Sequence, residues 1–468
     1  MTTNSNLLVA VKEYMEQPGV LNLPMYQRLA NALADEIMQG RVEPGGRLPT
    51  HRELAGNLDV NITTITKAMA LLQEAKLVDT RPGRGTRVAL HQQPETQFQS
   101  APRNDPGVID LSVNRPATDA YNHMLAAVLP ELSRDPRFAS MQDYHPSEGP
   151  EWARQAMASW LRQQGVNAHA DRIVLCEGAQ HGLSITLRSI AEAGDTILTD
   201  EVTYQGISAL CKMLDIHLVG IETDQDGMRP AAVRRACKKH RPRALFVVSS
   251  IQNPTAVTLT LERRRELAAI AEEQQLLLIE DDVYKPLLDA STQPIVNLLP
   301  ERTIYVSSLS KCIAPGLRMG FVLAPPDLVA DIGTSLRVDC WSVPAMSALI
   351  ATHLIESGRA QDLVVVQREE LRARQRILAT CCGDLQVRSG ATAPHAWLTL
   401  PEAWHGHDFV GRCLEQGVAI LPGSAFSLNP ASQPHAVRIN LSAAPTREKL
   451  ATALTVIARL AHQGPHGS

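Results

Sequence analysis

Residues 303–320 read TIYVSSLSKCIAPGLRMG, and this stretch decides how the larger part of the chain is interpreted. Its first residues, Thr303-Ile304-Tyr305-Val306, are mostly β-branched or aromatic and predict a strand. Lys311 follows in a serine-rich turn, and Pro315-Gly316-Leu317-Arg318 comes soon after it. A lysine presented just beyond the end of a strand is well placed to act as an amine nucleophile.

The length and composition are those of a globular protein with several domains. A chain of 468 residues leaves room for two or three domains, and the apolar fraction of 44% is ordinary for a folded protein. No run approaches the roughly 18 apolar residues of a membrane span, and the N-terminus lacks the basic start of a secretory signal, so we expect a cytoplasmic protein. The eight scattered cysteines form no C-x-x-C pair, which predicts reduced thiols and neither a disulfide nor a metal site.

From about residue 108 the chain alternates short apolar runs with stretches of helical length, such as Leu261–Glu273. Repeated strand-helix-strand units predict an α/β fold with a largely parallel sheet flanked by helices. Ligands of such sheets bind beyond the carboxyl ends of the strands, so functional polar motifs are expected there. The strand candidates are Ile173–Cys176, Thr196–Thr199, Ala244–Ser249, Leu276–Glu280, Thr303–Val306 and Gly320–Ala324.

Polar or small residues follow nearly every predicted strand. They supply a lysine for an aldehyde, a carboxylate for a pyridine nitrogen, and donors for a phosphate, which is what pyridoxal phosphate requires. The groups concerned are Gly178, Ala179 and Gln180 in a turn that opens a helix, Tyr204, Asn253, Asp281, Tyr284 and Lys311. Free N–H groups at a helix start can hold the phosphate. Each motif taken alone is equally consistent with an ordinary turn.

The order of these motifs resembles that of fold-type I aminotransferases, the aspartate aminotransferase superfamily. The resemblance implies that Lys311 forms the Schiff base and that Asp281 partners the pyridine nitrogen. It also implies a large cofactor domain over residues 108–344 and a small α+β lobe over residues 345–468. The implied contacts of the cofactor phosphate are Gly178, Ala179, Gln180, Ser308 and Arg318, and those of its ring are Tyr204, Asn253 and Tyr284.

The same resemblance assigns three further residues. Arg438 corresponds to the arginine that binds the substrate α-carboxylate, although a lone arginine there would equally suit a surface ion pair. The segment Asn114-Arg115-Pro116 stands where the family commonly has a glycine before the proline near the substrate carboxylate. We therefore expect Asn114 to bind substrate and the substrate site to differ in shape. Tyr144 is expected to reach the cofactor phosphate of a neighbouring subunit, because sites in this superfamily lie at a dimer interface.

The N-terminal part of the chain carries a different pattern. Apolar residues at helical spacing predict a helix over residues 26–37, and Thr50-His51-Arg52-Glu53 forms a capping box that starts another. Asn61 can cap a third helix, and segments 77–80 and 86–88 predict a hairpin with a basic tip. Two short helices followed by such a hairpin form a winged helix-turn-helix, whose second helix enters the major groove of DNA.

Residues 24–88 resemble the winged helix of GntR-family bacterial transcription regulators, through the segments GRLPTHRELA at 46–55 and GRGT at 83–86. Residues 41–90 hold eight basic and five acidic side chains, although the whole chain has a formal net charge of −4. An ordinary solvated basic face is the alternative explanation of these charges. The implied DNA contacts are Arg52, Thr63, Thr64, Lys67, Arg81, Gly83 and Arg84.

Residues 90–107 are rich in Gln, Pro, Ser and Asn and are expected to form a tether, preceded by a DNA-binding domain over 23–89 and an extension over 1–22. The whole arrangement resembles the MocR-like subgroup of GntR regulators. This resemblance implies a homodimeric, pyridoxal phosphate-dependent regulator that senses an amine or amino acid through aldimine formation at Lys311. Two alternatives stay open: an active aminotransferase carrying a DNA-binding module, and a DNA-binding protein with an inactive cofactor domain.

Overall fold

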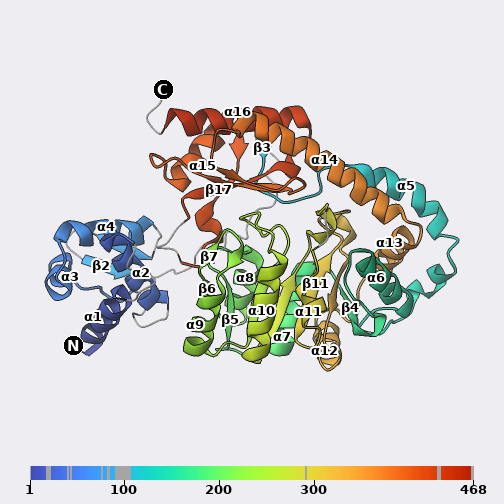
Figure 1. Ribbon diagram of the computed structural model, residues 1–468, viewed down its shortest axis with the longest axis horizontal. Helices are drawn as coiled ribbons and strands as arrows, with labels where there is room; N and C mark the ends of the chain where they lie inside the picture. Colours follow the sequence, from blue (N-terminus) through green and yellow to red (C-terminus); the bar gives the residue numbers. More distant parts are fainter. Residues whose placement is uncertain are drawn as a thin grey trace. The chain divides into compact units, whose positions relative to one another are not determined.

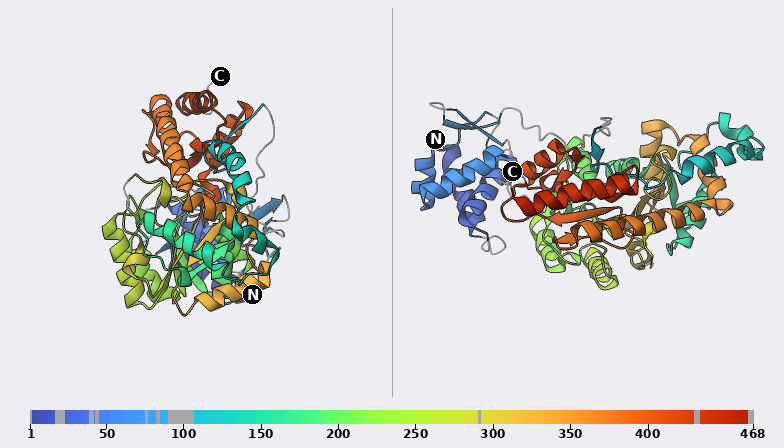
Figure 2. Two further views of the ribbon diagram at one scale, coloured as in Figure 1. Left: turned by 90° about the vertical axis from the view of Figure 1, so that its right-hand side faces the viewer. Right: turned by 90° about the horizontal axis from the view of Figure 1, so that it is seen from above.

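The computed structural model describes residues 2–16, 23–38, 42, 45–74, 77–81, 85–89, 107–289, 292–429 and 434–464. The chain divides into two compact units, residues 1–99 with 427–434 and residues 100–426 with 435–468. Figure 1 labels their elements, and Figure 2 gives two further views. Each unit is described by itself.

The described residues of the first unit form four helices and one hairpin. Its elements are α1 Thr2–Met15, α2 Met25–Met38, α3 His51–Leu58, α4 Ile62–Glu74, β1 Val78–Arg81 and β2 Gly85–Val88. The two strands pair antiparallel, with Val78 opposite Val88. The helix predicted over residues 26–37 is confirmed as α2, and its Leu33 and Ile37 are buried in one core with Ile65 of α4. Helix α1 contributes Leu7, Val11 and Met15 to the same core.

Side-chain caps fix the starts of α3 and α4. The predicted capping box is confirmed: the Glu53 carboxylate accepts the N–H of Thr50 at 2.7 Å, and the Thr50 hydroxyl accepts the N–H of Glu53 at 3.3 Å. Asn61 also caps α4 as predicted, because its Oδ1 accepts the N–H of Thr63 at 3.0 Å. Asp59, between the two helices, has a left-handed backbone with φ of 53°. The direction of α4 is therefore set by local hydrogen bonds.

The second unit is built on a seven-stranded sheet in the order β4-β12-β11-β10-β9-β5-β6. Its strands are β4 Ile173–Cys176, β5 Thr196–Asp200, β6 His217–Ile221, β9 Ala244–Val248, β10 Leu277–Asp281, β11 Thr303–Ser308 and β12 Gly320–Leu323. Neighbouring pairs are parallel except those of β12, which runs antiparallel to β11 and β4. Six of the seven strands were predicted from sequence to within two residues. The edge strand β6 was missed, since its exposed and half-buried residues lack the apolar run of a central strand.

Helices cover both faces of this sheet, as an α/β fold requires (Figure 1). Alternate strand residues point to opposite faces, so Phe246 packs in one core and its neighbours Leu245 and Val247 in another. The Phe246 side holds α7 Ala179–Ile190, α8 Gln205–Met213 and α12 Val329–Cys340, and the opposite side holds α6 Glu151–Gln163, α9 Pro230–His240, α10 Leu261–Glu273, α11 Ile295–Leu298 and α13 Ala345–Glu356. Helix α10 has the bounds that its sequence predicts.

A smaller lobe contains a four-stranded antiparallel sheet in the order β13-β14-β17-β16. Its elements are α14 Arg359–Cys382, β13 Val387–Arg388, β14 His395–Thr399, α15 Gly406–Glu415, β15 Val418–Ala419, β16 Leu421–Pro422, β17 Ala436–Asn440 and α16 Arg447–Gln463. The strand β3 Ile109–Asp110 pairs with β15, and Leu111 is buried in the core of this lobe. The first described residues of the second unit are therefore built into the C-terminal lobe.

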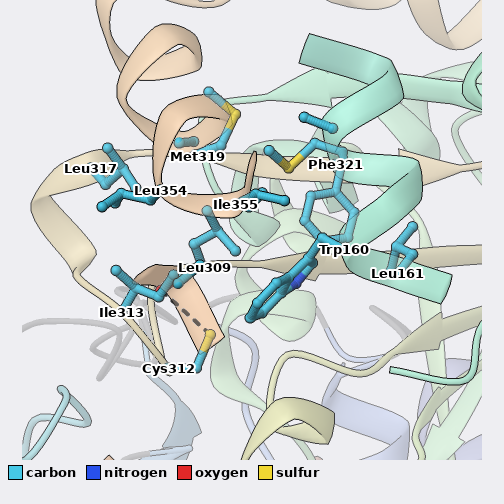
Figure 3. Close-up of a cluster of buried hydrophobic side chains, with 14 of the residues drawn as sticks. Trp160, Leu161, Leu309, Cys312, Ile313, Leu317, Met319, Phe321, Leu354 and Ile355 are labelled. Atoms are coloured by element: carbon cyan, nitrogen blue, oxygen red, sulfur yellow. Dashed lines mark hydrogen bonds between the residues drawn. The ribbon is translucent and has the colours of Figure 1, made fainter. Parts of the chain in front are cut away.

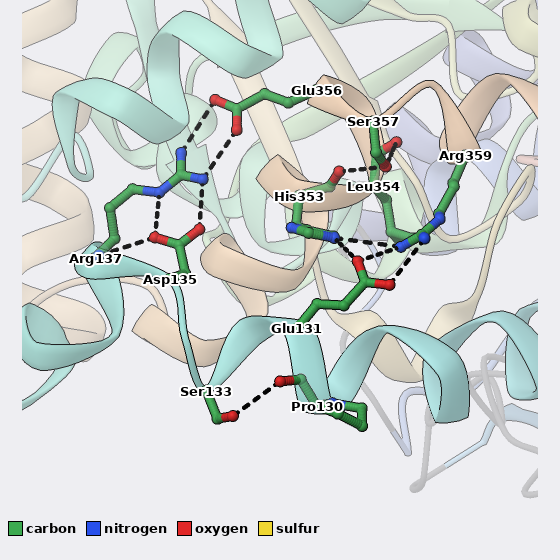
Figure 4. A network of polar contacts seen from close by, with 10 residues as sticks. All are labelled: Pro130, Glu131, Ser133, Asp135, Arg137, His353, Leu354, Glu356, Ser357 and Arg359. Carbon is green, nitrogen blue, oxygen red and sulfur yellow. Dashed lines mark hydrogen bonds and ion pairs between the residues drawn. The ribbon is translucent and has the colours of Figure 1, made fainter.

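A polar network ties the helix α5 Ala120–Leu132 to α13 and α14 (Figure 4). The Glu131 carboxylate accepts hydrogen bonds from Arg359 at 2.8 Å and contacts His353 at 2.9 Å. Beside it, Arg137 forms ion pairs with Asp135 and Glu356. These contacts hold α5 against α13 and α14. Among the described residues, no helix combines the length and apolarity needed to cross a membrane.

Candidate functional site

Lys311 is held on a turn that is anchored in the core. The residues around it, Leu309, Cys312, Ile313 and Leu317, belong to the cluster that also contains Trp160 of α6 and Leu354 of α13 (Figure 3). The N–H of Ile313 donates to the carbonyl oxygen of Leu309 at 2.8 Å, which closes the turn. The lysine therefore emerges from a rigid support at the end of β11.

The amine of Lys311 donates to the backbone carbonyl oxygen of Asn114 at 2.8 Å. Burial lowers the pKa of Lys311 to about 8, with repulsion from Arg438 adding to the shift and Asp281 opposing it. A lowered pKa increases the fraction of neutral amine near neutral pH, and the neutral amine is the nucleophilic form.

Asp281, at the end of β10, is a buried carboxylate without a strong donor. Among the described residues it accepts a single hydrogen bond, from the N–H of Val283 at 3.4 Å. Burial raises the pKa of Asp281 to about 7, repulsion from Asp282 adds to this, and Lys311 opposes it. Such a carboxylate gains most from a ligand that brings it a cationic N–H.

The start of α7 forms a cup of hydrogen-bond donors. Its N-cap, Gly178, has φ of +84° and no side-chain cap, so the first N–H groups of the helix are left for a ligand. A Cβ at Gly178 would lie 3.1 Å from the Arg318 guanidinium, and one at Gly320 would lie 2.6 Å from the backbone of Gly178. Glycine at both positions lets strand, helix start and guanidinium meet. The free N–H groups of α7 and the Arg318 guanidinium are together suited to an anion. The buried hydroxyl of Ser310, next to Lys311 in the chain, has no described partner.

The structure brings most of the predicted cofactor contacts to this place. Ser308 is buried at the end of β11, where its Oγ accepts the N–H of Ser310 at 3.4 Å. The side chain of Gln180 accepts the Tyr204 hydroxyl at 3.0 Å, so it positions that ring and leaves its backbone N–H at the helix start. Ala179 is the first residue of α7.

Arg438, on β17, is buried, and no described carboxylate lies within ion-pair distance of its guanidinium. It donates to Oδ1 of Asn253 at 2.9 Å and to the carbonyl oxygen of Ser112, while its Nε has no described partner. The ring of Phe426 lies 4.8 Å from its Cζ. Burial lowers the pKa of Arg438 to about 10, against the attraction of Tyr284, Tyr204 and Asp110. A buried guanidinium with a free N–H is suited to a ligand carboxylate.

Asn114 also lies in this site. Its amide nitrogen donates to the Tyr284 hydroxyl and lies 3.5 Å from Nδ1 of His395. Sequence reasoning missed His395, which is fully buried and has no flanking motif. The residues that its ring contacts all lie more than a hundred positions away in the chain, so no local pattern could have marked it.

Tyr144 is the predicted contact that the chain does not bring to the site. It is 87% exposed and stacks on Trp341, with ring centroids 5.4 Å apart. An exposed position is where a contact to another subunit would have to be.

Four of the predicted DNA-binding residues lie on α3 and α4 of the first unit. Arg52, Thr63 and Lys67 are exposed and Thr64 is half-exposed, on α3 and α4. The Lys67 ammonium also lies 5.7 Å from the ring centre of Tyr26. Gly83, Arg84 and the side chain of Arg81 lie outside the described residues.

The comparison with known families follows the two units. Aminotransferase class I and II matches residues 106–457, three quarters of the chain. The chain belongs to this family. Bacterial regulatory proteins of the gntR family match residues 25–88, which confirms the winged helix and the MocR-like arrangement expected from sequence. A gntR-type DNA-binding domain is therefore fused to an aminotransferase class I and II domain.

Relatives with both parts have similar lengths. The HTH-type transcriptional regulator YdeF of Bacillus subtilis (strain 168) is 27% identical, over 93% of this chain and 94% of the relative. The HTH-type transcriptional regulator TauR of Rhodobacter capsulatus is 24% identical, over 90% and 93%. A kynurenine aminotransferase of Pyrococcus horikoshii, solved in complex with PMP, covers 78% of this chain and 96% of its own at 20% identity, with a TM-score of 0.71. This last likeness shows the shared fold of the second unit.

Proposed function

We propose that this protein is a transcription regulator that binds DNA through its winged helix and senses an amine or amino acid with pyridoxal phosphate bound at Lys311. One observation carries the proposal: Lys311, with a lowered pKa, shares its site with the buried Arg438, which has no carboxylate partner among the described residues, in a chain that also holds a gntR-type domain. The regulators YdeF and TauR, which match nearly the whole chain, support the DNA-binding half.

The residues present fit this cofactor. The α7 cup, with Arg318 and the serines, would hold the phosphate, Asp281 would face the pyridine nitrogen, and Lys311 would join the aldehyde carbon. When bound, pyridoxal phosphate supplies a reversible covalent link to amines and withdraws electrons from the bonds next to that link. A protonated pyridine nitrogen would supply the cationic N–H that Asp281 lacks.

Sensing would use the exchange of one amine for another. With the cofactor bound, an incoming primary amine would replace Lys311 as its covalent partner. Lys311 would be released as a free amine and would take up the proton that the incoming amine gives up. Arg438 would bind the carboxylate of an amino acid, and Asn253 would orient Arg438 through its 2.9 Å hydrogen bond. A ligand can shift the protein only by the difference between its affinities for two states.

The second candidate function, an active aminotransferase, is favoured by the same complete site. Full turnover also requires an acceptor keto acid and a freed Lys311 that acts as a base. Purified protein is therefore incubated with pyridoxal phosphate, a panel of amino acids and 2-oxoglutarate. Several turnovers per site would establish the enzyme, whereas a spectral change that stops after amine binding supports the sensor.

A control variant separates both from an inactive cofactor domain. Lys311→Ala should remove the visible absorption that forms when pyridoxal phosphate is added to the wild type. Unchanged absorption in this variant would contradict the proposed role of Lys311. DNA binding to the upstream region of the gene is then measured with and without the amine that shifts the spectrum most, and equal affinities would contradict sensing.

We further propose a homodimer that acts in the cytoplasm, where its DNA partner is found. A two-fold dimer places two winged helices on the two halves of a symmetric site. The exposed Tyr144 would then be available to the phosphate site of the other subunit. Sedimentation at several concentrations tests the dimer, and a monomer in the presence of cofactor would contradict it.

A further inference from the structure

His395 lies among the groups of the site although no motif marks it. It is the first residue of β14 and is fully buried. Its Nε2 lies 3.0 Å from the carbonyl oxygen of Gln252, and its Nδ1 lies 3.5 Å from the amide nitrogen of Asn114. Its ring meets that of Tyr284 edge to face, with centroids 5.7 Å apart. Three neighbours therefore fix the orientation of the ring.

These contacts determine which nitrogen carries the hydrogen. A carbonyl oxygen can only accept, so Nε2–H donates to Gln252 and Nδ1 is the acceptor. Burial, with repulsion from Arg438 and Lys311, lowers the pKa of His395 to about 3, against the hydrogen bond to Gln252. The ring is therefore neutral at physiological pH, and its two nitrogens keep fixed and different roles.

The acceptor at Nδ1 in turn orients the Asn114 amide. Only the NH₂ group of Asn114 can face a bare ring nitrogen, and its second hydrogen is donated to the Tyr284 hydroxyl. The Tyr284 oxygen thus accepts one hydrogen bond, and no described residue accepts its own hydrogen. That hydroxyl is a buried donor left for a ligand.

We infer that His395 is a positioning residue, which acts through Asn114 to make the Tyr284 hydroxyl donate to the ring oxygen of bound pyridoxal phosphate. The inference rests on the proposed function. A donor at the ring oxygen draws off part of the negative charge there, and this charge helps to hold a proton on the nearby lysine-bound nitrogen. Loss of the donor should raise the pKa of this nitrogen by about one unit, the effect of about one hydrogen bond.

Two matched variants separate the two ring nitrogens. In His395→Asn the amide oxygen takes the place of Nδ1 and keeps the acceptor for Asn114. In His395→Gln the longer side chain reaches toward the carbonyl oxygen of Gln252 and removes that acceptor. The pH dependence of the visible absorption of the loaded protein should stay near the wild-type curve in His395→Asn and move up by about one unit in His395→Gln. Equal shifts, or none in either, would overturn the inference.

A double substitution tests the path through Asn114. Asn114→Leu should shift the curve as His395→Gln does, and the two together should shift it no further, because they interrupt the same chain of hydrogen bonds. Additive shifts would overturn the inference. Should His395→Gln fail to fold, the half-exposed Asn114 still decides, since Asn114→Leu must shift the curve and Asn114→Ser, which keeps a donor, must shift it less.

A second readout needs no turnover. The dissociation constant of pyridoxal phosphate should rise in His395→Gln and Asn114→Leu, and the thermal unfolding of the cofactor-free proteins shows whether either change acts through folding instead. A wild type without Lys311-dependent absorption would contradict the proposed function. Wild-type absorption that these substitutions leave unmoved would contradict only the role of His395.

Discussion

In the winged helix, the residues expected to meet DNA, such as Arg52 and Thr63, are exposed, and the core beneath them is made of aliphatic side chains. In the aminotransferase class I and II domain, Arg438, Asp281 and His395 are buried. Arg438 donates to the side chain of Asn253, and His395 contacts the carbonyl oxygen of the preceding residue, Gln252. The exposed polar groups of the winged helix have little effect on its stability, since water satisfies their hydrogen bonds. The second site removes charges from water, so its pKa values move and its stability depends on pH. The aminotransferase class I and II domain, with its buried charges, is therefore the part that should respond to a small ligand.

The largest effect is expected when the buried guanidinium of Arg438 is removed. Arg438→Gln should weaken the spectral response to amino acids by about a hundredfold, because a carboxylate would lose a charge-assisted partner in a buried site. An amine without a carboxylate should respond as in the wild type. The measurement is the concentration dependence of the absorption change for both ligands. Equal losses for the two would show that Arg438 supports the fold and does not read the carboxylate.

Asp281→Asn tests the stability cost of the buried carboxylate. The folded pKa of Asp281 is raised from 3.8 to about 7, so between these values the folded state holds a proton that the unfolded state has released. Stability of the cofactor-free protein therefore falls as pH rises from about 4 to 7, and the variant should lack this component. Its melting temperature should fall less over that range, by several degrees.

Asp200 provides the matched control for this prediction. Burial raises its pKa to about 7 as well, although the side-chain amide of Gln252 opposes the shift. Asp200→Asn should flatten the same part of the stability curve. Only Asp281→Asn should also weaken the binding of pyridoxal phosphate, and equal binding losses would contradict the distinct role of Asp281.

Arg52→Ala tests the exposed side of the comparison. We expect about a tenfold loss of affinity for DNA from the upstream region of the gene, and a salt dependence reduced by about one unit of slope. The melting temperature should hardly change, since the side chain is exposed. Arg265→Ala, an exposed arginine on α10, removes the same charge and should leave DNA affinity unchanged. Identical effects of the two substitutions would place DNA elsewhere on the molecule.

The smallest expected effect lies in the network of Figure 4, which is partly open to solvent and belongs to the aminotransferase class I and II domain. Hydrogen bonds from Arg359 and His353 lower the pKa of Glu131 to about 2. A lowered carboxylate pKa stabilises the fold above the ordinary value of 4.5, and this contribution is lost as pH falls toward 2. Glu131→Gln should lower the melting temperature by only about 2 °C at neutral pH, because solvent screens the pair. A larger fall would show that exposure alone does not separate the two kinds of site.

The sequence predicts what is encoded locally. The capping box at Thr50, the strand before Lys311 and the glycine at the start of α7 each depend on residues a few positions apart, and all three are found as expected. The contact of His395 with Asn114 joins residues 281 positions apart, so it depends on how two lobes fold together. The pairing of β3 with β15 is missed for the same reason. The strand β6 is missed because four of its five residues are exposed or half-buried, so it lacks the apolar run of a central strand.

One contact has consequences for the energetics of the whole chain. The carbonyl oxygen that accepts the Lys311 amine belongs to Asn114, seven positions beyond Gly107, where the described part of the second unit begins. A lysine that gives up a proton or forms a covalent bond has fewer hydrogens to donate to that carbonyl. Linkage is reciprocal. If the protonation of Lys311 changes the free energy of the segment around Asn114, then a partner that shifts this segment changes the pKa of Lys311 by the same free energy. The protonation of Lys311 thus responds to a change in the segment around Asn114, as well as causing one.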